Sequence, residues 1–276
     1  MAGEETTIDL EAYFRRIGYE GPREPTLETL SALHLLHPLA IAFENLDPLL
    51  QQPVNLDLPS LQRKLVHSGR GGYCYEQNTL FDAVLRALGF RVSGLAARVL
   101  WGREDLPVTP RTHMLLRIEL SEGTYVADVG FGRITLTAPL RLESGIEQPT
   151  PHEISRLDPE GSMWVMKAKI GEEWRALYRF DLEEQFPADY EIFNYFVSTN
   201  PGSLFVHSLM AARPTPDGGR YALFNGRLSI HGVRGINGPR ELDSAEEIET
   251  VLREIFGIDI PDSTALAEAL RRETIV

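Results

Sequence analysis

One stretch of the chain combines a cysteine with the start of a helix. Residues 70–78 read Arg-Gly-Gly-Tyr-Cys-Tyr-Glu-Gln-Asn, and Cys74 is the only cysteine among the 276 residues. Free N–H groups and the positive end of a helix dipole favour a thiolate in a first helical turn, and the thiolate is the nucleophilic form. We therefore predict a nucleophilic cysteine; a buried structural cysteine is the alternative.

A nucleophilic cysteine needs a base, and the base needs a group that orients it. His113 precedes an apolar stretch at residues 114–118, and Asp128 lies near the end of another at residues 124–129. If these stretches form a hairpin, residues directly opposite each other have numbers that add up to about 243 or 244. His113 and Asp128 add up to 241, so they would be near neighbours and not directly opposed. Burying a carboxylate alone is costly, so Asp128 needs such a partner. The alternatives are a histidine satisfied at a strand end and an aspartate that caps a turn at Gly130.

The remaining candidate residues give weaker signals. His34 and His37 share one helix face and could ligate a metal ion, but no third ligand is close in sequence, so we predict no metal site. Gly130 and Gly132 follow a predicted strand and can bring N–H groups close to a ligand, although an ordinary tight turn explains them equally well. The other histidines have no companion pattern: His67, His152, His207 and His231.

The charge balance limits the possible partners. The chain has 40 acidic and 27 basic residues, a formal net charge of −13, which disfavours nucleic acid and anionic membranes. A single cysteine rules out an intramolecular disulfide. No apolar run is long enough for a transmembrane helix, and the first ten residues lack the apolar core of a signal peptide. The expected location is the cytoplasm.

Periodicity divides the chain into three regions. The first ninety residues have helical spacing, with a helix beginning near Cys74 and closed by Gly89. Short, apolar, turn-bounded segments then predict strands and a barrel or small sandwich. They lie at residues 91–101, 114–120, 124–129, 162–170 and 174–180.

The last region has a mixed pattern. We expect a helix at residues 186–197 and two strands, 204–212 and 221–230, around the turn 216–219. Residues 244–247 form a capping box that begins a helix through Phe256. A short final helix follows at residues 265–272.

These motifs together resemble the arylamine N-acetyltransferase family. Residues 70–78 are similar to its nucleophile motif, and residues 112–113 and 128–132 are similar to its histidine and aspartate segments, in the same order and at similar spacing. Three further segments extend the similarity over essentially the whole chain: residues 43–46 (Phe-Glu-Asn-Leu), 97–101 and 198–201. Ala42 departs from the family, which commonly has proline there.

The resemblance implies an α+β fold in three parts. These are an N-terminal helical bundle with the nucleophile (residues 1–90), a central β-barrel with the histidine and aspartate (residues 91–182), and a C-terminal α/β lid (residues 183–276). It also implies the triad Cys74, His113 and Asp128, with acetyl-CoA as donor. It implies further that the acetyl group passes through acetyl-Cys74 to an arylamine or hydrazine in a ping-pong reaction.

The resemblance extends to residues that contact the two substrates. Those expected along the CoA path are Trp101, Thr112, Gly130, Phe131 and Gly132. Those expected around the acceptor pocket are Phe43, Tyr75, Phe131 and Phe205, although each aromatic could equally belong to the core.

Three other functions remain open at this point. The same triad serves cysteine hydrolases and transglutaminase-like enzymes, and an amide synthase of the same fold would have a more open pocket. A binding protein with a vestigial triad is the third, and the intact residues argue against it. A homo-oligomer is also left open.

Finally, Arg70 and Glu44 lie in motifs that pack at one end of the bundle, so we predict an ion pair between them.

Overall fold

The first part of the protein consists of helices with clear local start and stop signals. The structure, a computed structural model, describes residues 7–102, 108–232 and 238–276. The side chains of Asp9 and Thr26 accept N–H groups from the first turns of α1 (Leu10–Ile17) and α2 (Leu27–Ala40). Gly18 ends α1 with a φ of 68°, a conformation that glycine adopts without strain.

The nucleophile helix follows three short helical segments. They are α3 (Leu46–Leu49), α4 (Leu58–Leu61) and the π-helix Gln62–His67. Leu61, Leu65 and Val66, which have helical spacing in the sequence, lie at the end of α4 and in this π-helical segment. α5 (Cys74–Ala87) begins where predicted, because the Glu76 carboxylate accepts the N–H of Tyr73 at 3.1 Å just before the first turn.

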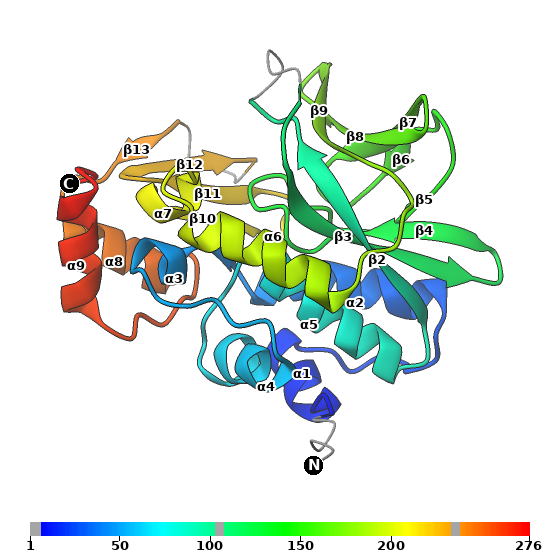
Figure 1. Cartoon of the computed structure of the whole chain (residues 1–276), viewed down its shortest axis with the longest axis horizontal. Helices are drawn as coiled ribbons and strands as arrows, with labels where there is room; N and C mark the ends of the chain where they lie inside the picture. Colours follow the sequence, from blue (N-terminus) through cyan, green and yellow to red (C-terminus); the bar gives the residue numbers. More distant parts are fainter. Residues whose placement is uncertain (1–6, 103–107, 233–237) are drawn as a thin grey trace.

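An eight-stranded antiparallel sheet forms the second part (Figure 1). Its order is β5-β4-β3-β2-β9-β8-β7-β6. The strands are β2 (Arg91–Val99), β3 (Arg111–Leu120), β4 (Gly123–Ala127), β5 (Leu140–Arg141), β6 (Gln148–Pro149), β7 (Ile154–Glu160), β8 (Met163–Ile170) and β9 (Glu173–Phe180). Beyond β5, a bridge joins Ser144 to Leu157 of β7, so the sheet curls into a nearly closed barrel.

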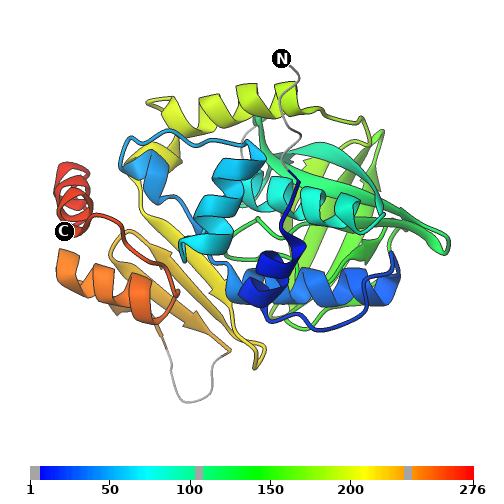
Figure 2. The ribbon, with the colours of Figure 1, turned by 90° about the horizontal axis from the view of Figure 1, so that it is seen from below.

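The register of the β3–β4 hairpin matches the prediction. Leu120 pairs with Gly123 and Glu119 with Thr124, so paired numbers add up to 243. The side chains alternate between two cores: Leu115 lies inside the barrel, and Leu116 packs against the helices. Figure 2 shows the N-terminal helices lying over the barrel strands, which places the start of α5 against this hairpin.

In the residues that the structure describes, the third part contains a five-stranded sheet and four helices, of which the last two pack against that sheet. Its order is β1-β10-β11-β12-β13, and β1 (Phe43–Glu44) comes from the N-terminal part. The other strands are β10 (Met210–Pro214), β11 (Arg220–Phe224), β12 (Arg227–His231) and β13 (Arg240–Glu241). The helices are α6 (Pro187–Thr199), α7 (Leu204–His207), α8 (Ala245–Glu254) and α9 (Ser263–Arg272). Apolar residues of α8 and α9 share one core with this sheet, which lies to the left of the barrel in Figure 1.

Two predicted strands of the last region are wrong. Residues 204–207 form α7, because the Ser203 hydroxyl caps a helical turn, and the strand begins only at Met210. Residues 221–230 are two strands, because Asn225, with a φ of 53°, turns the chain at an Asn-Gly pair. β7 was not predicted. Within the described ranges, no helix is long and apolar enough to cross a membrane.

Candidate active site

Cys74 lies at the first residue of α5 and borders a cavity of about 350 Å³. The residue is 3% exposed, and its Sγ lies 3.7 Å from the carbonyl oxygen of Thr112 on β3. The glycine pair before it allows a close approach of two segments, since a Cβ on Gly71 would stand 2.0 Å from the carbonyl oxygen of Ala42. The thiol therefore sits at the junction of the bundle, the barrel and the segment that leads into β1.

His113 and Asp128 form a buried pair beside this cysteine. The Nε2 of His113 lies 2.7 Å from the Oδ2 of Asp128, and the two residues are 2% and 0% exposed. Residues that pair between β3 and β4 have numbers that add up to 243, whereas 113 and 128 do not. Asp128 directly follows the last residue of β4, so it lies outside that register and can meet His113. Because Nε2 faces the carboxylate, Nδ1 is the ring nitrogen left for Cys74.

The electrostatics of the pair favour a charged histidine. Burial alone would lower the pKa of His113, but the charge and hydrogen bond of Asp128, helped by Cys74, raise this pKa to about 10. Burial would raise the pKa of Asp128, yet His113 and the hydrogen bonds from Gly130 and Asn78 hold it below its usual value. At neutral pH the site thus contains an imidazolium and a carboxylate, which is the charge arrangement that stabilises a neighbouring thiolate.

Asn78 fixes Asp128 from the nucleophile helix itself. Its Nδ2 donates to the Oδ1 of Asp128 at 3.1 Å and to the carbonyl oxygen of Met114 at 2.8 Å. The N–H of Gly130 also donates to that Oδ1, at 3.0 Å. The position requires glycine, because a Cβ on Gly130 would stand 2.8 Å from the Cα of Cys74. The sequence places Asn78 in the motif but does not indicate this contact.

Two aromatic rings hold the imidazole in place. The ring of Tyr178 on β9 lies 4.8 Å from that of His113, and the ring of Phe131 lies 5.1 Å from it on an edge-to-face contact. Tyr178 was not predicted, because a contact between two strands distant in sequence leaves no local signal.

The cavity brings together most of the residues expected to contact substrate. Trp101, Thr112, Gly130, Phe131 and Gly132 border it, as do Phe43 and Phe205. Arg133 borders it as well, and the third part of the protein contributes five more residues: Leu204, Met210, Leu223, Phe224 and Ser229. Most of its wall is apolar, with Cys74 and His113 at one side.

Tyr75 lies elsewhere. Among the described residues, those that border the cavity do not include Tyr75, which is fully buried against the rings of Tyr73 and Tyr190. A residue next to the first residue of a helix points about 100° away from it, so Cys74 and Tyr75 face different sides of α5.

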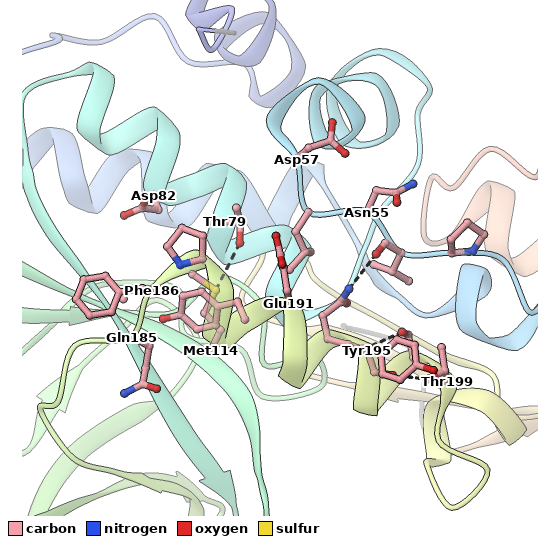
Figure 3. Close-up of a pocket in the computed structure, with 18 of the residues that line it drawn as sticks. Asn55, Asp57, Thr79, Asp82, Met114, Gln185, Phe186, Glu191, Tyr195 and Thr199 are labelled. Atoms are coloured by element: carbon pink, nitrogen blue, oxygen red, sulfur yellow. Dashed lines mark hydrogen bonds between the residues drawn. The ribbon is translucent and has the colours of Figure 1, made fainter. Parts of the chain in front are cut away.

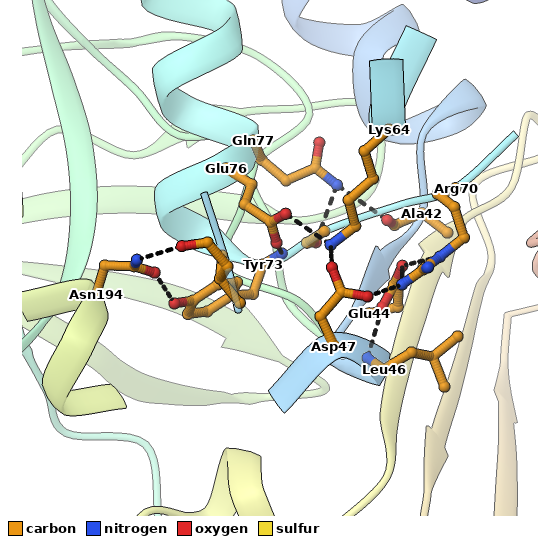
Figure 4. Close-up of polar contacts among 12 residues, drawn as sticks. Ala42, Glu44, Leu46, Asp47, Lys64, Arg70, Tyr73, Glu76, Gln77 and Asn194 are labelled. Carbon is orange, nitrogen blue, oxygen red and sulfur yellow. Dashed lines mark hydrogen bonds and ion pairs between the residues drawn. The ribbon is translucent and has the colours of Figure 1, made fainter. Parts of the chain in front are cut away.

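A cluster of charged side chains lies on another side of the same helix start (Figure 4). The predicted pair is confirmed: Arg70 lies 2.8 Å from Glu44, with exposures of 8% and 0%. Arg70 also contacts Asp47 at 2.7 Å, and Lys64 lies 2.6 Å from both Asp47 and Glu76. Burial and the neighbouring carboxylates raise the pKa of Glu76 to about 7, although Lys64 opposes this rise. We define these five residues as the ion cluster.

His34 and His37 each have a structural partner in place of a metal ion. The Nε2 of His34 accepts the N–H of Asp128 at 3.0 Å. The ring nitrogens of His37 lie 2.8 Å from the Tyr13 hydroxyl and 2.6 Å from the Gln77 side-chain oxygen. Throughout residues 7–102, 108–232 and 238–276, no group of three or more His, Cys, Asp or Glu could hold a metal ion.

A larger cavity, of about 880 Å³, lies between α6, α5 and residues 53–57 (Figure 3). Its labelled lining includes Asp57, Asp82, Glu191 and Tyr195. It reaches Met114 but none of the triad residues border it. Size alone would favour this cavity as the functional site, whereas Cys74 and His113 border the smaller one.

The arrangement of bundle, barrel and lid around a buried cysteine, histidine and aspartate is that of enzymes that transfer an acyl group through a cysteine. Comparisons with known proteins identify the family. A family model described as N-acetyltransferase matches residues 26–265. The arylamine N-acetyltransferase of Escherichia coli is 43% identical over 254 residues, which cover 92% of this chain and 90% of the relative. A Salmonella typhimurium relative, an arylamine N-acetyltransferase / N-hydroxyarylamine O-acetyltransferase, is 41% identical over 93% of this chain and 91% of its own length.

Solved structures agree with these relatives. The arylamine N-acetyltransferase of Mycobacterium marinum superposes with a TM-score of 0.91 at 42% identity, covering 96% of this chain and 99% of that one. The same enzyme has also been solved in complex with CoA. This chain belongs to the arylamine N-acetyltransferase family. The α+β fold expected from the resemblance is confirmed.

Proposed function

We propose that this protein transfers an acetyl group from acetyl-CoA to the nitrogen of an arylamine or arylhydrazine through an acetyl-Cys74 intermediate. The observation that supports this most is the 2.7 Å contact between His113 and Asp128 directly beside a cysteine that borders an apolar cavity. A relative solved with CoA supports the donor, and the names of the curated relatives support the acceptor.

In the first half-reaction the Cys74 thiolate attacks the carbonyl carbon of the acetyl thioester. A carbon–sulfur bond forms to Cys74 and the one to CoA breaks, and the leaving CoA sulfur takes a proton from the His113 imidazolium. A thioester is exchanged for a thioester, so the step is nearly balanced in free energy. Backbone N–H groups near Cys74 are proposed to stabilise the negative oxygen that develops.

In the second half-reaction the acceptor nitrogen attacks acetyl-Cys74. His113, now neutral, takes the proton that the nitrogen loses, and the Cys74 sulfur leaves as thiolate beside the restored imidazolium. Asp128 keeps the imidazole in one orientation and stabilises its charged form. The triad thus returns to its starting state.

The two substrates are proposed to share the cavity in turn. CoA is assigned to the side formed by Trp101, Thr112 and the turn at residues 130–132, and the acceptor to the side formed by Phe43, Phe131 and Phe205. The T-shaped contact between the rings of Phe43 and Phe205, whose centroids lie 6.3 Å apart, gives a flat aromatic amine an apolar wall. Tyr75, which is buried against Tyr73 and Tyr190, is assigned to the core and not to this wall.

The test is the mass of the intact protein after incubation with acetyl-CoA alone. One acetyl group should be added to the wild type and none to Cys74→Ala, since the chain has no other cysteine. Later addition of an arylamine should remove the group and form the N-acetyl product. Absence of any mass gain, with hydrolysis of the acyl-enzyme shown to be slow, would exclude the proposed intermediate.

The rival functions give different results in the same assay. A hydrolase would lose the acetyl group to water at the same rate with or without an amine. A binding protein would neither gain mass nor release CoA. The cytoplasmic location and a homo-oligomeric state stay predictions.

A further inference from the structure

His34 lies in α2, far along the chain from the triad, yet it contacts one member directly. It is 0% exposed, and its Nε2 accepts the N–H of Asp128 at 3.0 Å. Asp128 is the first residue after β4. Its N–H therefore lies just beyond the regular pairing of that strand, where a buried N–H needs another acceptor.

The imidazole of His34 is neutral at physiological pH. Burial lowers its pKa to about 4, although the charge of Asp128 opposes this shift. Because Nε2 accepts a hydrogen bond, the ring proton is on Nδ1, and Nδ1 makes no hydrogen bond with any residue in the described ranges. A buried N–H without a partner is unfavourable, so an apolar side chain would suit the core better here. The contact with Asp128 is the feature that accounts for a histidine.

The neighbouring histidine of the same helix shows that this contact is specific. His37 is equally buried, and both rings lie edge-on to Phe81. Its partners are Tyr13 and Gln77, which belong to the bundle and not to the barrel. His34 alone of this pair connects the bundle to the acid of the triad.

Asp128 is thereby held from several directions at once. Its carboxylate is fixed by His113, Asn78 and Gly130, whereas its main chain is fixed by His34. A neutral acceptor is suited to this role, because it holds the backbone without neutralising the negative charge that His113 needs. A protonated His34 would lose the acceptor and compete with His113 for the carboxylate.

We propose that His34 is a positioning residue of the triad, which sets the main chain of Asp128 so that its carboxylate meets His113 and keeps Cys74 reactive. The proposal rests on the function proposed above for Cys74, His113 and Asp128. The role depends on one hydrogen bond, which His34 accepts from the N–H of Asp128. Side chains at position 34 that can accept this bond should therefore keep the role, and those that cannot should lose it.

The experiment compares three variants with the wild type. His34→Leu removes the acceptor at similar size, and His34→Gln can place its side-chain oxygen near the position of Nε2. Phe81→Leu is the matched control, because it loosens the same part of the core without touching a polar contact. His34→Met serves as a second variant without a strong acceptor if His34→Leu does not fold.

Two readouts are measured on each folded variant. The first is the rate at which iodoacetamide alkylates Cys74, the sole cysteine, as a function of pH. The second is kcat/KM for acetyl transfer. His34→Leu should lower alkylation at pH 7 and acetyl transfer by about 10- to 100-fold, since small displacements in a catalytic site have effects of that size. Its alkylation curve should move to higher pH.

The controls decide between positioning and mere packing. His34→Gln should stay within about threefold of the wild type, because it keeps the acceptor. Phe81→Leu should lower the unfolding temperature without moving the alkylation curve. The proposal is overturned if His34→Leu has the wild-type curve, if His34→Gln loses as much as His34→Leu, or if Phe81→Leu moves the curve equally. The proposed function could fail separately. If the alkylation curve differs between the wild type and His34→Leu but the wild type transfers no acetyl group, the proposed function is rejected and the positioning role stands.

Discussion

Two buried polar networks meet at the first turn of α5, and they balance their charges in different ways. In the ion cluster, three carboxylates surround Lys64 and Arg70, and every cation touches two of them. In the triad, the charge of His113 faces Asp128 alone, and the remaining side of the ring faces a thiol. Each cation of the cluster is therefore enclosed by two carboxylates, whereas His113 has one carboxylate partner and leaves its other side to Cys74.

The comparison shows that a perturbed pKa does not identify a catalytic residue. Glu76 has a pKa raised to about 7, a value suited to proton transfer, and shifts of this kind mark functional candidates. Yet none of the ion cluster residues, all of which the structure describes, borders the cavity, whereas Cys74 and His113 do. Access to the cavity is therefore the feature that distinguishes the two networks.

The largest expected effect comes from removing the nucleophile. Cys74→Ser should lower acetyl transfer by about 10⁴-fold or more, because a serine hydroxyl does not ionise near neutral pH and triad losses are of this order. The unfolding temperature should stay unchanged, since the substitution alters one atom in a nearly buried position. Steady-state assays with acetyl-CoA and an arylamine measure this, and retention of most activity would mean that Cys74 is not the nucleophile.

Asp128→Asn should have the next largest effect. An asparagine keeps the shape but cannot stabilise the imidazolium and can hold the wrong tautomer, so activity should fall on the order of 10³- to 10⁴-fold. The curve of Cys74 alkylation against pH should move to higher pH. If Asp128 only capped the turn at Gly130, to which its Oδ1 is bonded at 3.0 Å, stability would fall while the curve stayed in place. Superimposable curves would remove Asp128 from the triad.

The charged state of His113 should be visible as a pH dependence of stability. Its pKa is about 10 in the folded protein and about 6.5 in an unfolded chain, so the folded state binds the extra proton between these values. The stabilisation is fully present below pH 6.5 and is lost as the pH rises through 10, at up to about 1.4 kcal/mol per pH unit.

Urea unfolding of the wild type and of His113→Gln from pH 6 to 10 checks this. The other titratable side chains are the same in both proteins, so the difference between the two curves isolates His113 and its contacts. The difference should shrink as the pH rises. A difference that does not change with pH would show that His113 is neutral at pH 7.

The sequence was sufficient where one local signal determined one structure. The glycine pair and the helical pattern after it correctly placed the start of α5 at Cys74. The turn after residue 120 predicts the β3–β4 register, and that register alone places His113 near Asp128. The Asn225-Gly226 hairpin was also present as a local signal and was overlooked.

Other features depend on contacts that no local pattern encodes. Tyr178 reaches His113 from a strand more than sixty residues away, and the bond from Asp128 to His34 crosses from the barrel to the bundle. β1 joins the sheet of the last region although it lies within the first ninety residues, so the pairing of Phe43 with Ala212 does not respect the predicted boundaries. Those boundaries, at residues 90 and 182, stay predictions.

The smallest effect concerns the ion cluster, and it tests its supporting role. Glu44→Gln should destabilise the protein by about 3 kcal/mol, the lower end for one partner of a buried ion pair, because Asp47 still contacts Arg70. Glu11→Gln is the matched control: the Glu11–Arg23 pair is 2.6 Å long but exposed, and such pairs contribute little that can be measured. Urea unfolding gives both values.

The alkylation curve of Cys74 should not move in Glu44→Gln, because the cluster neither faces the cavity nor contacts His113. An unchanged stability would mean that the cluster is only a set of compensated charges, and a displaced alkylation curve would mean that the two networks act as one.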